Sequence, residues 1–147
     1  MENQNEKQVA PITILNQYIK DLSLEIPHAP QIFTKIDIQP QIKIDAQIRS
    51  EVVDENIYNV SLSFRIDGDV KEEKFFIVEL DYCGVVSLNI PEEHVDAVLK
   101  IEVPHMLFPY ARQAISGVLM DAGLPPLMLN PIDFVAMYHA NKKSETK

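Results

Sequence analysis

The stretch LFPYARQAISGVLMDAGLPPLMLNPIDF, from Leu107 to Phe134, holds a helix and the turn that stops it. Pro109 stands where a proline in the first helical turn needs no N–H, and apolar residues recur behind it at helical spacing. Gly123 suits the left-handed conformation that ends many helices, and the prolines after it prevent a new helix before Ile132. The pattern predicts a helix from about Phe108 to Ala122 and a final helix from about Ile132 to Ala140.

The first half of the chain alternates apolar and polar residues, which is typical of half-buried strands. Apolar side chains occupy the even positions from Ile36 to Ile48, although Pro40 makes this strand an edge or delays its start. The same alternation predicts strands over about Tyr18–Ile26 and Tyr58–Ile66. Asp67-Gly68 directly follows and predicts a hairpin turn.

A further strand is predicted from Lys74 to Ile90, with a bulge or bend at Cys83-Gly84. The period then becomes helical, and Pro91-Glu92-Glu93 is a favourable start for a short helix that Pro104 ends. Strands come first and helices last, which is the order of an α+β fold. We therefore expect a four-stranded antiparallel sheet with helices packed on one face.

Length and composition indicate one domain. The chain has 147 residues and is 46% hydrophobic, which is sufficient for a core. Residues 1–10 and 141–147 are polar and aperiodic, so we expect disordered tails on either side of a domain over 11–140. The N-terminus lacks the basic and apolar regions of a signal peptide, and no apolar run approaches the roughly 20 residues that span a bilayer. We expect a cytoplasmic protein that does not insert into membranes.

The charge of the chain argues against nucleic acid as a partner. The net charge is −9, from 22 acidic against 13 basic residues, and the basic residues do not form a run. Acidity serves solubility in many proteins, and it also suits a basic partner. The single cysteine, Cys83, cannot form an internal disulfide and is interpreted as a small packing residue.

The sequence offers little for catalysis. The histidines at 28, 94, 105 and 139 are isolated and form no zinc-binding pattern, and neither a phosphate loop nor a nucleophile elbow is present. We expect no catalytic site, no metal and no cofactor. A binding protein is the favoured class, and an enzyme is a minor alternative.

The strand from Lys74 onward carries more apolar side chains than one sheet face requires. Residues 75–78 are apolar at both parities, which is typical of a strand with two covered faces. One parity forms a complete apolar stripe of Phe76, Val78, Leu80 and Tyr82. We interpret this stripe as a subunit interface, with burial in the chain's own core as the alternative.

A second excess of apolar residues lies around the prolines near the C-terminus. Prolines deny this segment regular backbone pairing, so it is predicted to line a groove or cover a sheet edge. Its methionines suit promiscuous apolar binding, and they also occur in ordinary cores. The candidate groove combines this segment with the strand before it: Ile38, Ile42, Ile44, Leu124, Leu127, Met128 and Met137.

The strings FPYAR (Phe108–Arg112) and PPLMLNPIDF (Pro125–Phe134) strongly resemble motifs of the SecB protein-export chaperone family. IKDLSLEIPHAPQIF (Ile19–Phe33) is similar to the family's first strand and the turn after it. The resemblance covers about Ile14 to Tyr138. It implies a cytosolic homotetramer, a dimer of dimers, that binds unfolded precursor proteins without ATP and delivers them to the translocation ATPase SecA.

The resemblance also implies roles for particular residues. The family's SecA-facing positions match Asp21, Glu25, Ile77 and Glu79. Positions that the family uses at subunit interfaces match the apolar stripe of the fourth strand. Ile38 stands where some members carry an aromatic residue.

Two other hypotheses remain beside the secretion chaperone. A SecB-like chaperone dedicated to one partner, such as an antitoxin, would use the same fold and grooves. A small-ligand binding protein or an enzyme would instead need an enclosed cavity with converging polar groups.

Overall fold

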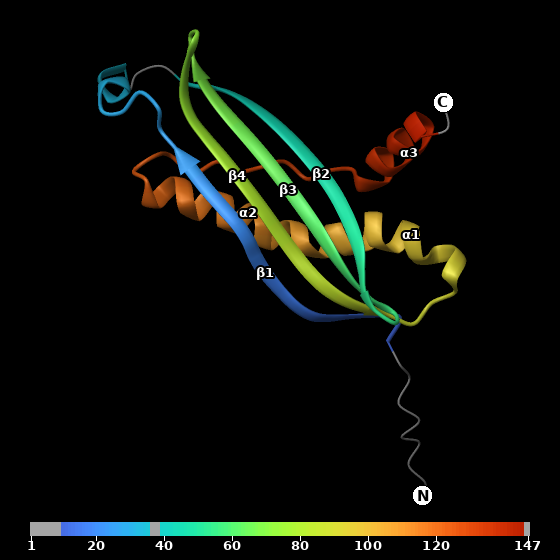
Figure 1. Cartoon of the computed structure of the whole chain (residues 1–147). Coiled ribbons are helices and arrows are strands. Elements are labelled where there is room, and N and C mark those ends of the chain that lie inside the picture. The colour runs from blue at the N-terminus through green and yellow to red at the C-terminus, as the bar shows by residue number, and fades with distance from the viewer. Residues whose placement is uncertain (1–9, 36–38, 146–147) are drawn as a thin grey trace, which may run out of the picture.

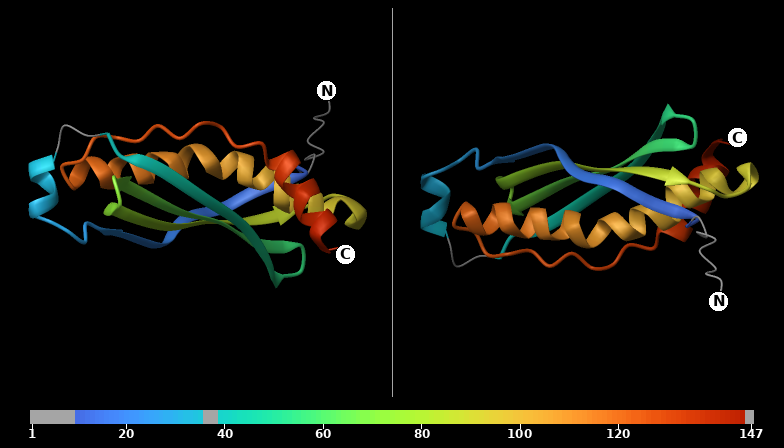
Figure 2. Two further views of the ribbon diagram at one scale, coloured as in Figure 1. Left: turned by 90° about the horizontal axis from the view of Figure 1, so that it is seen from above. Right: turned by 90° about the horizontal axis from the view of Figure 1, so that it is seen from below.

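The computed structural model describes residues 10–35 and 39–145. Its four strands are β1 (Ile12–Glu25), β2 (Gln41–Asp54), β3 (Ile57–Val70) and β4 (Glu73–Leu88). They form one antiparallel sheet in the order β1-β4-β3-β2 (Figure 1). The long helix α2 (Val103–Asp121) lies across one face, and the irregular segment after it lies on the same side (Figure 2). The expected α+β fold is confirmed.

Two tight turns join the last three strands, and neither is at Asp67-Gly68. The turns lie at 55–56 and 71–72, where Asn56 and Lys71 both have φ of 58°. Asp67 and Gly68 continue β3 and pair with Ile77 and Phe76 of β4. The predicted hairpin position was wrong because pairing with both neighbouring strands outweighs the local turn preference of Asp-Gly.

The bulge on β4 is also placed differently from the prediction. Residues 83 and 84 pair regularly with both neighbouring strands. The irregularity lies where Gly68 pairs with Phe76 and Asp69 with Lys74, which leaves Phe75 as an extra residue on β4. β1 begins at Ile12, six residues before the predicted Tyr18. Alternation did not reveal this start, because register shifts after Ile14 and after Ile19 interrupt it.

A helical run precedes α2 without a break. It consists of η2 (Glu92–His94), α1 (Val95–Ala97) and the π-helical η3 (Val98–Glu102). Pro104 therefore does not end a helix but lies in the first turn of α2, directly after the π-helical η3. Pro109 lies inside α2 rather than at its start. Pro109 and His105 are both exposed, so water can reach the carbonyl that loses its helical hydrogen bond.

The end of α2 agrees with the sequence prediction at Gly123. This residue has φ of 81°, its N–H donates to the carbonyl of Met120, and the N–H of Leu124 donates to the carbonyl of Leu119 at 2.9 Å. This pair of hydrogen bonds is a Schellman motif, and buried Leu119 and Leu124 supply its apolar contact. The chain then runs without regular structure to α3 (Phe134–Glu145), where the Asp133 side chain accepts from the N–H of Ala136 at 3.0 Å.

α3 extends past the predicted boundary at Ala140. The expected disordered C-terminal tail from Asn141 is wrong for residues 141–145, which are helical. Within the described part of the chain, no helix is both long enough and apolar enough to cross a membrane.

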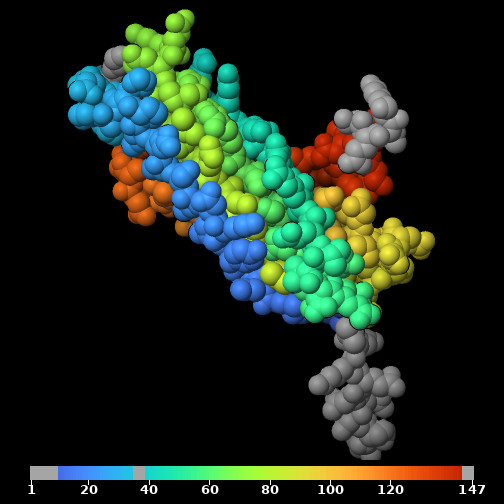
Figure 3. Space-filling view, viewed as in Figure 1, coloured from blue at the N-terminus to red at the C-terminus, as the bar shows by residue number. Residues whose placement is uncertain are grey.

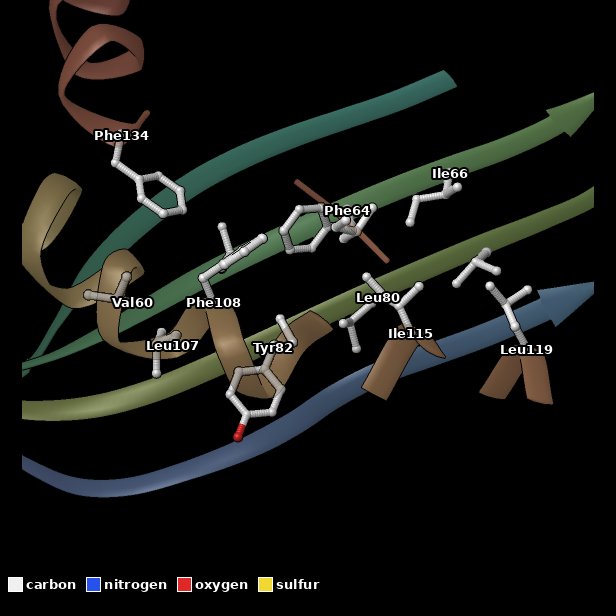
Figure 4. Close-up of a cluster of buried hydrophobic side chains, with 14 of the residues drawn as sticks. Val60, Phe64, Ile66, Leu80, Tyr82, Leu107, Phe108, Ile115, Leu119 and Phe134 are labelled. Carbon is white, nitrogen blue, oxygen red and sulfur yellow. The ribbon is translucent and has the colours of Figure 1, made fainter. Parts of the chain in front are cut away.

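The core lies between α2 and the sheet. Figure 4 shows Ile115, Leu107 and Phe108 of α2 facing Phe64 and Leu80 of the sheet. The β4 stripe predicted to be a subunit interface lies in this core, with exposed fractions of 8% or less: Phe76, Val78, Leu80 and Tyr82. That prediction is wrong, because α2 of the same chain already covers these side chains. Each fully buried aliphatic side chain here contributes about 1.5–3 kcal/mol.

Candidate functional site

An apolar hollow of about 440 Å³ lies where the C-terminal end of α2 approaches β2. Phe75 and Phe76 come from β4, Ile42 from β2, and Leu124 and Leu127 from the segment after α2. Among the described residues that line it, Gln39 is the one with a polar side chain. The hollow is therefore suited to apolar side chains and lacks converging polar groups.

A second hollow of about 280 Å³ continues along β2. It shares Ile42 and Leu127 with the first, and it adds Ile44, Met128 and Ile132. We call the two hollows together the β2 groove. Among residues 10–35 and 39–145, β2 pairs with β3 alone, so within this part of the chain the other edge of β2 is an open strand edge beside the groove.

The prolines explain why the segment after α2 forms a wall rather than another strand. Pro125, Pro126 and Pro131 cannot donate backbone hydrogen bonds to β2. Leu124 and Leu129 anchor the segment at exposed fractions of 7% and 3%, whereas Met128 is 78% exposed. The segment is held at two points and offers a flexible apolar side chain between them.

The structure brings together five of the seven predicted groove residues: Ile42, Ile44, Leu124, Leu127 and Met128. Met137 instead lines a separate hollow of about 290 Å³ with Asp96, Lys100 and Tyr138. Its inclusion in the groove was wrong, because α3 carries it away from the β2 groove. Ile38 lies outside the described residues.

The sequence reasoning missed the aromatic part of the groove. Phe33 and Phe75 meet edge to face with ring centroids 6.2 Å apart, and Phe75 meets Phe76 at 5.9 Å. Alternation predicts Phe76 in the interface stripe and Phe75 on the opposite sheet face. The bulge at Phe75 places both side chains in one hollow, and strict alternation could not show this.

A second surface lies on the sheet face opposite α2. Figure 3 shows this face, on which the side chains of the four strands lie next to one another. Pairing of Asp21 with Asp81, of Ser23 with Glu79 and of Glu25 with Ile77 places the four predicted SecA-facing residues together. We call Asp21, Glu25, Ile77 and Glu79 the outer acidic surface. Its acidic character also includes Asp45 and Asp81, which line a shallow hollow of about 350 Å³ with Asp21 and Glu79.

Arg65 of β3 lies beside this surface, paired with Glu79, and was missed from the sequence. Its guanidinium donates to Glu79 at 2.9 Å and to Asp67 at 3.1 Å. Burial alone would raise the pKa of the Asp67 carboxyl, but hydrogen bonds from Lys74 and Arg65 outweigh burial and lower that pKa. The hydrogen bond to Asp67 likewise raises the pKa of Arg65, so the pair stays charged.

Next to the outer acidic surface, polar groups on the same sheet face satisfy one another. The Tyr18 hydroxyl donates to Asn59 at 2.7 Å, and the hydroxyls of Ser61 and Ser63 donate to Asp81. Cys83 is fully buried beneath them, with Sγ 3.5 Å from the Ser61 hydroxyl. Cys83 is a packing residue, as interpreted from the sequence. Across residues 10–35 and 39–145, no group of three or more His, Cys, Asp or Glu side chains is placed to hold a metal ion.

Comparisons with known proteins agree on one family. The sequence model described as preprotein translocase subunit SecB matches residues 4–145. The protein-export protein SecB of Rhodospirillum rubrum is 49% identical over 129 residues, covering 88% of this chain and 81% of its own length. The protein of the same name from Neisseria meningitidis is 38% identical, covering 95% and 96%.

A solved structure is similar in fold. It is a SecB-like chaperone of Mycobacterium tuberculosis in complex with a peptide from an antitoxin. The TM-score is 0.70 at 14% identity, and the match covers 83% of this chain and 91% of that one.

Proposed function

The chain belongs to the SecB family, and on this premise we propose that it is an ATP-independent cytosolic chaperone that binds unfolded precursor proteins and delivers them to SecA. The observation that carries this proposal is the β2 groove, an apolar channel beside an open strand edge. An extended chain can pair its backbone with such an edge while its side chains enter the hollows.

The physics of the groove suits weak and general binding. An unfolded segment that buries about 400 Å² of apolar surface gains about 10 kcal/mol before ordering and association reduce it. This gain comes from apolar burial and needs no nucleotide. A long client that contacts the grooves of several subunits then binds more tightly through multivalency.

The test is binding of a labelled precursor, unfolded in urea and diluted, followed by fluorescence anisotropy. Ile44→Asp and Met128→Asp place charges on exposed groove side chains, and each is expected to weaken binding at least about tenfold, a loss of about 1.4 kcal/mol. Val52→Asp changes an exposed residue at the far end of the same strand and should bind as the wild type does. The groove would be refuted as the client site if all variants bound the precursor equally well, or if the folded precursor competed as well as the unfolded one.

For delivery, we propose that the outer acidic surface binds the basic tail of SecA. The carboxylates of Asp21 and Glu79 lie on one sheet face, and a basic partner is attracted to such a surface at low salt. Asp21→Lys and Glu79→Lys should weaken binding of the tail, measured by isothermal titration, and make it less sensitive to salt. Asp121→Lys on α2 gives the same change in net charge away from this face and is the matched control. Wild-type affinity in both surface variants would refute the assignment.

We further propose a homotetramer, a dimer of dimers, with contacts at the β1 edge instead of the β4 stripe. Within the described part of the chain β1 pairs with β4 alone, which leaves its outer edge open there. Leu15 and Ile19 on β1 are 52% and 48% exposed, and Tyr110 on α2 is 55% exposed. Ile19→Arg should lower the mass found by light scattering, whereas Val52→Arg, at a more exposed residue on β2, should not. A monomeric wild type would end this proposal.

The alternative is a chaperone dedicated to one partner such as an antitoxin. The fold shared with the mycobacterial SecB-like chaperone makes the same groove available for that role. The curated relatives at 38–49% identity are protein-export proteins, and they favour export. A pull-down with this chain as bait separates the two: many unfolded precursors with SecA support export, and one stoichiometric partner supports the alternative.

A further inference from the structure

Gly68 occupies the middle of a row of three residues that crosses the sheet beneath the β2 groove. It pairs with Ile42 of β2 on one side and with Phe76 of β4 on the other. Because paired residues lie on the same sheet face, a side chain at position 68 would point into the groove between those of Ile42 and Phe76.

The backbone gives no reason for glycine at this position. Gly123 is the described glycine with a positive φ, so the conformation of Gly68 is open to other residues. Glycine inside a strand weakens it and often marks a close approach by another group. The reason for Gly68 must therefore lie in what covers it.

The ring of Phe76 covers it. A Cβ built on Gly68 would clash with Cε1 of Phe76 and would lie only 2.7 Å from Cζ and 2.8 Å from Cδ1. Carbon atoms in contact are normally about 3.5–4.0 Å apart, so the ring would have to move by on the order of 1 Å. Because Gly68 belongs to the sheet and pairs with Phe76, a side chain there would push the ring away from the sheet.

Movement away from the sheet carries the ring into the larger hollow of the groove. Phe76 lines that hollow with Phe75 and is 5% exposed, so its ring forms part of the floor. The hollow measures about 440 Å³, and a cavity of about 150 Å³ already holds benzene in another protein. Raising the floor would therefore exclude the largest side chains first.

We propose that Gly68 is a specificity-determining residue of the β2 groove: its missing side chain lets Phe76 lie against β3, and this sets the largest client side chain that the hollow accepts. The inference rests on the proposed client role of the groove. Gly68 of β3 does not itself line the larger hollow, but by this inference it controls the depth of that hollow.

The test uses labelled extended peptides that differ at one central position, alanine, leucine, phenylalanine or tryptophan, with anisotropy as the readout. In the wild type, phenylalanine and tryptophan should bind more tightly than alanine. Gly68→Val should reduce that preference at least about fivefold and leave the alanine peptide within about twofold, because edge-to-face contacts and burial are lost only for the large side chains.

Two further variants make the test specific. Gly84→Ala creates a similar clash, 2.8 Å from Cδ2 of Leu107 in the core, without touching the groove, and it should keep the wild-type preference. Phe76→Leu should deepen the hollow and increase the preference for tryptophan, and added to Gly68→Val it should restore binding of large side chains. Phe76→Leu also tests the floor if Gly68→Val does not fold.

The outcomes separate this inference from the function on which it rests. If the wild type binds none of the peptides, the client groove itself is refuted and Gly68 has no role in it. If the wild type binds them and Gly68→Val shows the same preference for large side chains, the role of Gly68 alone is overturned.

Discussion

Leu80→Ala tests whether the apolar stripe of β4 is core or subunit interface. Leu80 is 2% exposed and lies in one row with Leu22 of β1 and Phe64 of β3, beneath α2. Truncating a buried leucine to alanine costs about 2–5 kcal/mol, the lost transfer energy plus the cavity that remains. Domains of this kind are stable by about 5–15 kcal/mol in total, so the variant should lose a large part of its stability.

The assay is urea unfolding followed by far-UV circular dichroism at two protein concentrations, with light scattering on the folded protein. A slope of about 1–3 kcal/mol per molar urea converts the loss into a midpoint lower by on the order of 1 M or more. The exposed residue Val52 supplies the control, because Val52→Ala should change stability by about 0.5 kcal/mol or less. A variant that unfolds at the wild-type midpoint but scatters as a smaller species would show that Leu80 lies between subunits and would refute the core assignment.

Two predictions concern the charged and strained ends of β3. Lys71→Gly should raise the free energy of unfolding by about 0.5–1 kcal/mol in thermal unfolding, because φ of 58° strains lysine. Asn56→Gly should raise it by less, since asparagine tolerates this conformation. Asp67→Asn should be destabilising at pH 7 and less destabilising at pH 2. The folded pKa of Asp67 lies below the unfolded value of about 3.9, so its stabilisation is present above that value and is lost as pH falls through the folded pKa. Urea midpoints at both pH values check the second, and an equal deficit at pH 2 would contradict it.

The sequence predicted the parts of the fold that local patterns determine. Alternation located β3, and the left-handed preference of glycine located the end of α2 at Gly123. It failed where tertiary pairing overrides local preference. Asp67 and Gly68 form a strand because they pair with both β2 and β4, and Lys74 and Arg65 also bind the Asp67 carboxylate.

The candidate sites divide in the same way. Residues of one strand parity, such as Asp21 with Glu25 and Ile77 with Glu79, share a sheet face as alternation predicts, because parity survives in the regular parts of β1 and β4. The aromatic floor was missed because a single extra residue, Phe75, changes the parity of β4 where it enters the groove. A bulge depends on pairing with a neighbouring strand and leaves no periodic signal in its own strand.

The positions of the two proposed surfaces constrain how a client could be passed on. The β2 groove lies on the side of the sheet that carries α2, since Leu119 of α2 lines it, and the outer acidic surface lies on the opposite face. If both proposals hold, a client in the groove would not block docking of SecA, and docking would not displace the client by direct competition. Docking of SecA could release the client only if SecA bound the free chaperone more tightly than the client-loaded chaperone. Without such a difference, release would have to come from SecA binding the client itself, at the high local concentration that docking provides. Reversing charges on the outer acidic surface should then slow transfer to SecA while leaving client affinity unchanged.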